Sequence, residues 1–135
     1  MAPSVAAGSV YAFLTFLAGF ALGTLRVLLV APRLGATAAV SLEVPVILFA
    51  SWQLSRWCTR RFGVREAVGP RVLMGTVAFV ILMAAEIGVS VFVFRRSPAD
   101  HFAGYRSLSG VLGLAAQLAF ATFPFLQGRS AAAVR

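Results

Sequence analysis

The chain has 135 residues, of which 60% are hydrophobic and 12% are charged, whereas an ordinary soluble domain has about 45–50% apolar and ~25% charged residues. So few charged side chains cannot cover a soluble globule, and the mean hydropathy of +0.90 is typical of an integral membrane protein. The net charge of +8 comes from arginines at the ends of apolar runs, which we interpret as topological anchors that contact anionic lipid headgroups and not as a nucleic-acid surface.

The apolar runs predict an all-α fold, a four-helix transmembrane bundle in one integral membrane domain that covers residues 1–135. A membrane-spanning helix needs about 20 apolar residues, and each run reaches that length. The connections between the runs are short, so we expect sequential helices to pack antiparallel. The predicted helices cover about residues 10–31, 36–57, 71–94 and 107–128.

The first predicted helix carries small residues on the face that holds its arginine. Gly19, Gly23 and Arg26 follow one another at spacings of four and three residues, so they share one side of the helix. A Gly-x-x-x-Gly pair lets helices approach closely, and we interpret both glycines as a packing surface. Pro32 and Gly35 then end the helix in a tight hairpin turn.

The second predicted helix holds a carboxylate next to a proline. Glu43 is followed two residues later by Pro45, which is expected to kink the helix and free backbone carbonyls. This E-x-P pattern, together with the preceding G-x-x-x-G-x-x-R and P-x-x-G patterns, resembles small bacterial four-helix integral membrane proteins of unknown function. The resemblance covers mainly the first two helices and implies a fold and a bacterial inner membrane, but no activity.

A second carboxylate, Glu86, interrupts the third predicted helix. In the connection that follows, Ser97 precedes Pro98, and Asp100 stands three residues after the serine, as at the start of a capped helix. We therefore expect a short interfacial helix between helices 3 and 4. His101 is expected to be an exposed polar residue on it, with a pH-sensing or ligand-binding role as the alternative.

The fourth predicted helix has a second stripe of small residues. Gly110 and Gly113 lie on one face and predict another packing surface. Gln117 follows on the same face near the middle of the membrane, where it is a candidate polar lining residue.

Three ionisable residues, Arg26, Glu43 and Glu86, lie inside the predicted spans. Counting along the helices at about 1.5 Å per residue places all three in one layer, in the outer half of the membrane. We expect an intramembrane polar cluster in which Arg26 bridges the two carboxylates and one carboxylate holds a proton or the site binds a cation. The alternative is a structural role, in which buried ion pairs fix the register of the bundle.

The arginines also predict the orientation of the chain. One side of the membrane has four, and the side that holds both termini has seven, which places the termini in the cytoplasm by the positive-inside rule. The seven are Arg56, Arg60, Arg61, Arg65, Arg71, Arg129 and Arg135.

Two functions remain open from the sequence. The first is a non-enzymatic structural or accessory inner-membrane protein that packs with itself as a homo-oligomer or with a larger membrane complex, because small-residue faces are frequent and no nucleophile–base grouping is evident. The second is a small proton- or cation-coupled transporter or channel that uses the polar cluster. With one His and one Cys (Cys58) in the chain, we expect no metal site and no cofactor.

Overall fold

The computed structural model describes residues 2–134, apart from the side chains of residues 109 and 130–134, so Arg135 lies outside the described residues. Every element within that range is helical, which confirms the all-α prediction. The long helices are α1 (Ala2–Leu25), α3 (Ala36–Arg61), α4 (Val68–Gly88) and α6 (Leu108–Val134). The shorter elements are the π-helical segments η1 (Arg26–Val30) and η2 (Val89–Val93), the helices α2 (Ala31–Leu34) and α5 (Pro98–Ala103), and the 3-10 helix η3 (Gly104–Arg106).

Four stretches of the described chain are long and apolar enough to cross a membrane, so this is a multi-pass membrane protein. Each of the four extends beyond its predicted range at one end or at both. The first stretch comprises α1, η1 and α2 and begins at Ala2 rather than at residue 10. Pro3 lies in the first turn of α1, where its missing N–H costs no helical hydrogen bond. At the other end, α3 continues unbroken through Pro45 to Arg61.

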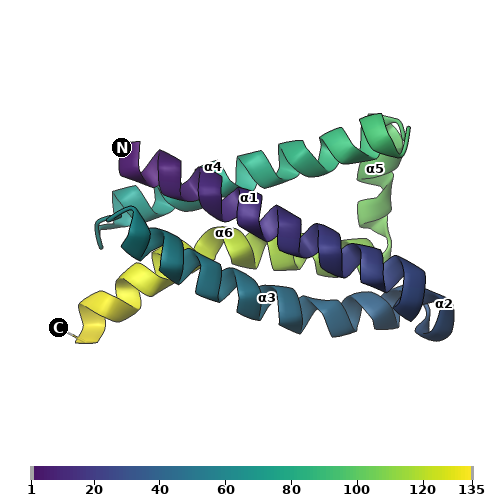
Figure 1. The fold of residues 1–135 in the computed structure, drawn as a ribbon, viewed down its shortest axis with the longest axis horizontal. Coiled ribbons are helices and arrows are strands. Elements are labelled where there is room, and N and C mark those ends of the chain that lie inside the picture. The colour runs from purple at the N-terminus through teal and green to yellow at the C-terminus, as the bar shows by residue number, and fades with distance from the viewer. Residues whose placement is uncertain (1, 135) are drawn as a thin grey trace.

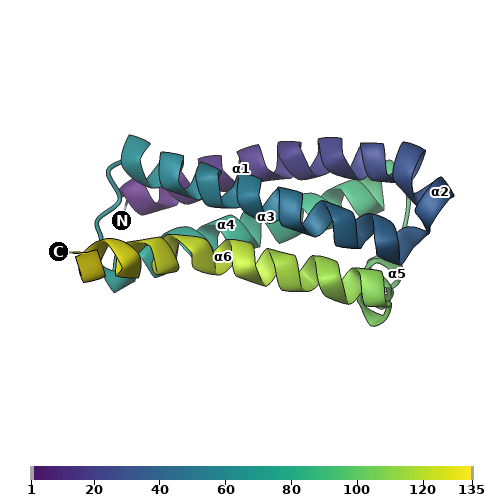
Figure 2. The ribbon, with the colours of Figure 1, turned by 90° about the horizontal axis from the view of Figure 1, so that it is seen from below.

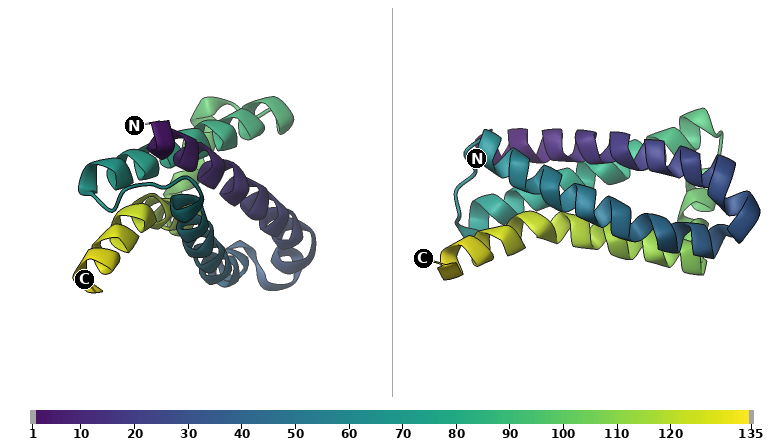
Figure 3. Two further views of the ribbon diagram at one scale, coloured as in Figure 1. Left: turned by 60° about the vertical axis from the view of Figure 1, so that its left-hand side comes forward. Right: turned by 60° about the horizontal axis from the view of Figure 1, so that its bottom comes forward.

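The long helices follow the order α1, α3, α6, α4 around the bundle (Figures 1 and 2). Sequential packing is therefore confirmed for α1 with α3 and for α4 with α6, but it is wrong for α3 and α4, which lie diagonally opposite. The reason is the connection of residues 62–67, which at about 3.3–3.6 Å per residue spans up to about 20 Å. This length exceeds one interhelical distance of about 8–10 Å, and the connection crosses the end of the bundle (Figure 3).

A Schellman motif at the end of α3 directs the chain into this crossing. Gly63 adopts a φ of +63°, a left-handed conformation that glycine tolerates without steric cost. Its N–H donates to the carbonyl of Arg60, and the N–H of Val64 donates to the carbonyl of Thr59. Val64 then joins the buried core that also contains Cys58.

Most of this core lies at the end of the bundle that holds both chain termini, here called the termini end (Figure 1). Two glycines bring helix backbones together there. A Cβ at Gly8 would lie 2.7 Å from the carbonyl oxygen of Met74, and a Cβ at Gly75 would overlap the carbonyl oxygen of Ala121. Helix α4 therefore touches α1 and α6 at backbone distance.

Tyr11 crosses the core from α1 to α6. Its ring stacks on Phe120 with the ring centroids 4.2 Å apart, and its hydroxyl donates to the carbonyl oxygen of Phe120 at 2.8 Å. Pro124 stands four residues after Phe120 and has no N–H, so this carbonyl lacks its usual partner within the helix. The tyrosine hydroxyl supplies the missing donor.

The helices separate towards the opposite end, here called the α5 end. There α4 diverges from α1 and α3, and α5 runs across the gap between the ends of α4 and α6 (Figure 1). The predicted short helix is confirmed: Pro98 lies in its first turn, and the Oγ of Ser97 accepts a hydrogen bond from the N–H of Asp100 at 3.0 Å. The bundle is thus packed closely at one end and open at the other.

Candidate functional site

A cavity of about 630 Å³ occupies the open half of the bundle. Its walls come from all four long helices, from η1 and η2, and from α5. The polar residues that line it are Thr15, Thr24, Arg26, Glu43, Ser51, Glu86, Ser90, Arg96, His101 and Gln117. All the residues predicted for the polar cluster therefore face one space.

Both carboxylates of this cavity lie at the same depth. Glu43 stands 5.5 residues from the centre of the 26-residue span Ala36–Arg61, and Glu86 stands 5.5 residues from the centre of the 26-residue span Val68–Val93, each towards the α5 end. At about 1.5 Å per residue, each lies roughly 8 Å from the middle of its span. This agrees with the depth counted from the sequence.

Arg26 and Glu43 form an ion pair between η1 and α3, with the arginine Nε 3.2 Å from the Oε2 of the glutamate. The hairpin turn at Gly35, where φ is +86°, brings these two positions side by side. The two atoms approach without the alignment of a hydrogen bond, so neither satisfies the other's hydrogen-bonding capacity. The pair is held by charge.

Glu86 binds a different partner from the one predicted. Its Oε2 accepts a hydrogen bond from the side-chain amide of Gln117, which joins α4 to α6. The expectation that Arg26 bridges both carboxylates is wrong: in the described part of the chain, Arg26 pairs with Glu43 alone. Because α3 and α4 lie diagonally, Glu86 faces α6, whereas Arg26 lies beside α3.

Five buried side-chain polar atoms of the described residues have no hydrogen-bond partner within the protein, and every one belongs to a residue that lines this cavity. Thr15 and Ser90 are only 5% and 6% exposed, so their hydroxyls are almost completely enclosed. An unsatisfied buried polar group costs about 1–3 kcal/mol. The atoms are Thr15 Oγ1, Arg26 Nε, Glu43 Oε2, Ser90 Oγ and Gln117 Oε1.

Polar groups in the packed half are satisfied by the protein itself. Ser55 donates to the Oε1 of Gln127 at 2.8 Å, and the amide of Gln127 donates to the carbonyl of Trp52 at 2.9 Å. Buried Arg71 donates from Nε to the carbonyl of Arg65 and from Nη1 to the carbonyl of Pro124. Unsatisfied groups therefore mark the cavity and not the core.

The small residues predicted to pack helices have a different role. Gly19, Gly23 and Gly113 line the cavity, and a Cβ there would meet at most the tip of a flexible side chain. Inside the described bundle they do not bring helices together, because helices approach closely at Gly8 and Gly75 instead. Gly110 does pack closely, although its partners are the backbone atoms of Gly104 and Tyr105 and not another long helix.

Two π-helical segments border the cavity, and sequence reasoning did not find them. The segment η1 begins at Arg26 itself, and η2 begins three residues after Glu86. A π-helical turn is rare, occurs mostly as a single turn inside an α-helix and is frequent at functional sites. The only visible sequence signal is Gly88 immediately before η2.

His101 lies at the rim of the cavity and is half-buried, so its predicted exposure is wrong. Its Nε2 lies 3.2 Å from the hydroxyl of Tyr105. Burial, and then the nearby Arg96 charge, lower the pKa of His101 below its usual value. Its surroundings therefore favour the neutral imidazole.

No family model, no curated protein and no solved structure matches this chain.

Proposed function

We propose that this protein is a small proton- or cation-coupled transporter or channel of the bacterial inner membrane, and that it catalyses no covalent reaction. The observation that supports the proposal is the gathering of two carboxylates and five unsatisfied polar atoms around one cavity at membrane depth. Such groups require water, an ion or a polar solute as partner. The resemblance of the first two helices to small bacterial membrane proteins supports the location.

Glu86 is the residue that binds the proton or cation in this proposal. The charge of Glu43 is offset by Arg26 at 3.2 Å, whereas Glu86 has the neutral amide of Gln117 beside it and no cation within 4 Å among the described residues. An uncompensated carboxylate is costly at this depth. Of the two carboxylates, Glu86 therefore gains more from binding a proton or a cation. If a proton and a solute cation replace each other on Glu86, proton movement is coupled to solute movement.

Flux measurements on Glu86→Gln test the proposal. The variant keeps the size of the side chain and removes its charge. We expect the full-length chain in proteoliposomes to conduct protons or K⁺. The flux through Glu86→Gln should be at least about tenfold slower, which corresponds to a rise of about 1.4 kcal/mol in the activation free energy. Glu43→Gln should also reduce flux, because it leaves Arg26 unpaired in the cavity.

Glu66→Gln is the matched control, because Glu66 is the third glutamate of the chain and does not line this cavity. It should conduct as the unaltered protein does. If Glu86→Gln and Glu43→Gln both leave flux unchanged while they lower thermal stability, the polar cluster is structural and the proposal fails.

The second candidate is a structural or accessory subunit that packs with itself or with a larger inner-membrane complex. It is supported by the polar contacts that join neighbouring helical segments: Arg26–Glu43 links η1 to α3, and Glu86–Gln117 links α4 to α6. Chemical crosslinking in mild detergent tests it. A strictly monomeric species that co-purifies with no partner contradicts this candidate.

A further inference from the structure

The geometry points to an amphipathic organic cation as the ligand of the cavity, entering from the side between α1 and α4. The inference rests on the proposed function and names its substrate class. It follows from three properties of the cavity: where it opens, which charges it presents and what covers its walls.

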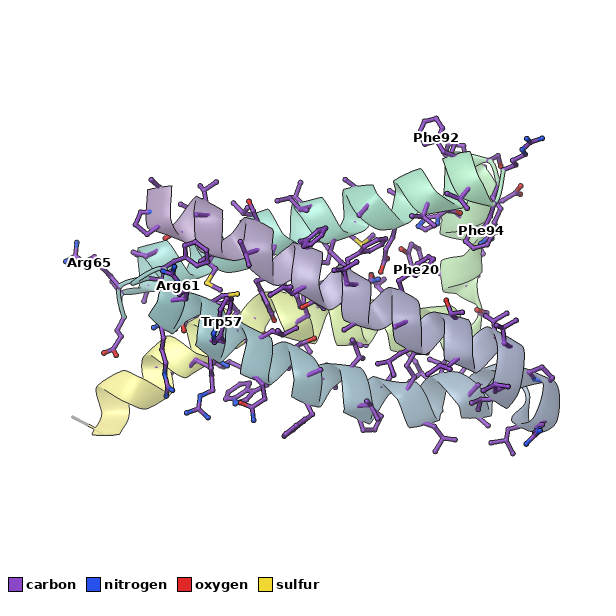
Figure 4. The ribbon with its side chains drawn as sticks, viewed as in Figure 1. Phe20, Trp57, Arg61, Arg65, Phe92 and Phe94 are labelled. Carbon is purple, nitrogen blue, oxygen red and sulfur yellow. The ribbon has the colours of Figure 1, made fainter. Side chains whose placement is uncertain are left out.

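The cavity opens sideways because nothing in the described chain closes the gap between α1 and the far half of α4. The segment η1 packs on α1, α2 and α3, whereas η2 packs on α4 and α5, so the two segments do not pack on each other. Phe20 of α1 and Phe94, which follows η2, both line the cavity yet are 52% and 65% exposed. Figure 4 shows both side chains in the space between α1 and α4. Because Phe20 lies within a membrane span, this opening faces lipid.

The charges inside favour a cation. Arg26 is paired with Glu43, whereas Arg96 keeps its charge but is exposed and directs its guanidinium to the backbone carbonyl of Asp100 at 2.8 Å and not to Glu86. Glu86 has no ion pair within 4 Å among the described residues, so a cation that enters the cavity can offset the charge of its ionised form. Around it, Ser90 Oγ and Gln117 Oε1 are unsatisfied and are able to accept hydrogen bonds.

Aromatic and aliphatic side chains cover the walls. Four phenylalanines line the cavity, and the face of each ring attracts a cation. A small inorganic ion makes little use of such walls, whereas an organic cation buries apolar surface against them while its charge approaches Glu86. The four are Phe16, Phe20, Phe94 and Phe120.

Binding of tetraphenylphosphonium to the detergent-solubilised full-length chain tests the inference, with empty micelles subtracted in equilibrium dialysis. We expect saturable binding, and we expect tetraphenylborate, an anion of nearly the same size and shape, to bind at least about tenfold more weakly. Glu86→Gln should weaken tetraphenylphosphonium binding about tenfold, and Glu86→Asp, which keeps the charge, should retain most of it.

The matched pair Phe94→Ala and Phe92→Ala tests whether the bound ligand contacts the residues at this opening. Phe94 lines the cavity, whereas Phe92 is 83% exposed and points away from the bundle (Figure 4). Phe94→Ala should weaken binding about threefold to tenfold through loss of a ring face, and Phe92→Ala should leave it unchanged. Circular dichroism and gel filtration identify any variant that fails to fold.

The outcomes separate this inference from the proposed function. Equal binding of the cation and the anion, or undiminished binding by Glu86→Gln, overturns the inference. If proton or K⁺ flux depends on Glu86 but tetraphenylphosphonium does not bind saturably, the inference fails and the proposed function stands. If both Glu86-dependent flux and saturable binding are absent, both fail.

Discussion

Pro124 shows how one missing N–H determines a contact between distant helices. Without that donor, the carbonyl of Phe120 would be buried and unpaired, and Tyr11 of α1 provides the hydroxyl that satisfies it. The stacked rings of Tyr11 and Phe120 hold the hydroxyl in place. This contact ties α1 to α6 across the centre of the packed half.

Replacement of Tyr11 by Phe should lower the stability of the bundle. The change keeps the stacked ring and leaves the Phe120 carbonyl without its donor, at a cost of about 1–3 kcal/mol. The midpoint of thermal unfolding in detergent should fall. Tyr105→Phe, the change at the other tyrosine of the chain, removes a hydroxyl that lies at the α5 end and should lower the midpoint much less. Equal falls in the two variants would contradict this assignment.

At the scale of residues, the sequence predicts pairs that share a short turn and misses those that depend on helix order. The pairing of Arg26 with Glu43 follows from their symmetric positions about the turn at Gly35. The bond between Glu86 and Gln117 requires knowledge that α4 lies beside α6. Hydropathy carries no such information, because it identifies the spans and not which spans are neighbours.

At the scale of elements, α5 is the part that local sequence specifies best. The Ser97 side chain caps its first turn, and Pro98 occupies the position that proline favours. The rings of His101, Phe102 and Tyr105 then pack on one another, with centroids 5.5–6.2 Å apart. The π-helical segments η1 and η2 were not predictable in this way, because no local residue pattern distinguishes them from ordinary helix.

The stability of α5 should depend on pH through His101. Folding lowers the pKa of this imidazole below its usual value of about 6.5, so below that pH the folded form binds fewer protons than the unfolded form. The contribution of His101 is therefore intact above about pH 7 and declines as the pH falls below about 6.5 towards the folded pKa. Amide hydrogen exchange in α5, corrected for the intrinsic effect of pH, should accelerate between pH 7.5 and 5.5.

His101→Gln provides the control for this measurement. Glutamine stays neutral across the range, so the extra acceleration in α5 should disappear. Exchange in α4 should show no such pH dependence in either protein. A pH response that persists in His101→Gln would mean that another group is responsible.

At the scale of the whole molecule, the number of spans follows from the lengths of the apolar runs, whereas the shape of the bundle does not. Gly19 and Gly23 form a Gly-x-x-x-Gly pair but line the cavity, while Gly8 and Gly75 make the backbone contacts without belonging to such a pair. Which glycine packs depends on where the helices cross. The crossing in turn depends on the connection that carries the chain diagonally from α3 to α4.

The two ends of the bundle should lie on opposite sides of the membrane. Single cysteines placed at Arg65, in the connection at the termini end, and at Asp100, in α5, should react with an impermeant reagent from opposite sides. Arg65 is expected on the cytoplasmic side by the positive-inside rule. The native Cys58 is buried and should be replaced by alanine to remove background. Labelling of both positions from one side would overturn the topology.

The backbone contact at Gly8 also has a mechanical consequence, because it holds one end of α1 against α4. The contact lies near the start of α1, and Arg26 stands 18 residues further along the chain. At about 1.5 Å per residue, the two positions are about 27 Å apart. A rotation of α1 by about 5° about the contact at Gly8 would displace Arg26 by about 2.4 Å over that length. A small change in the angle at which α1 crosses α4 near Gly8 would thus be magnified at the lipid-facing opening, without any helix having to unwind.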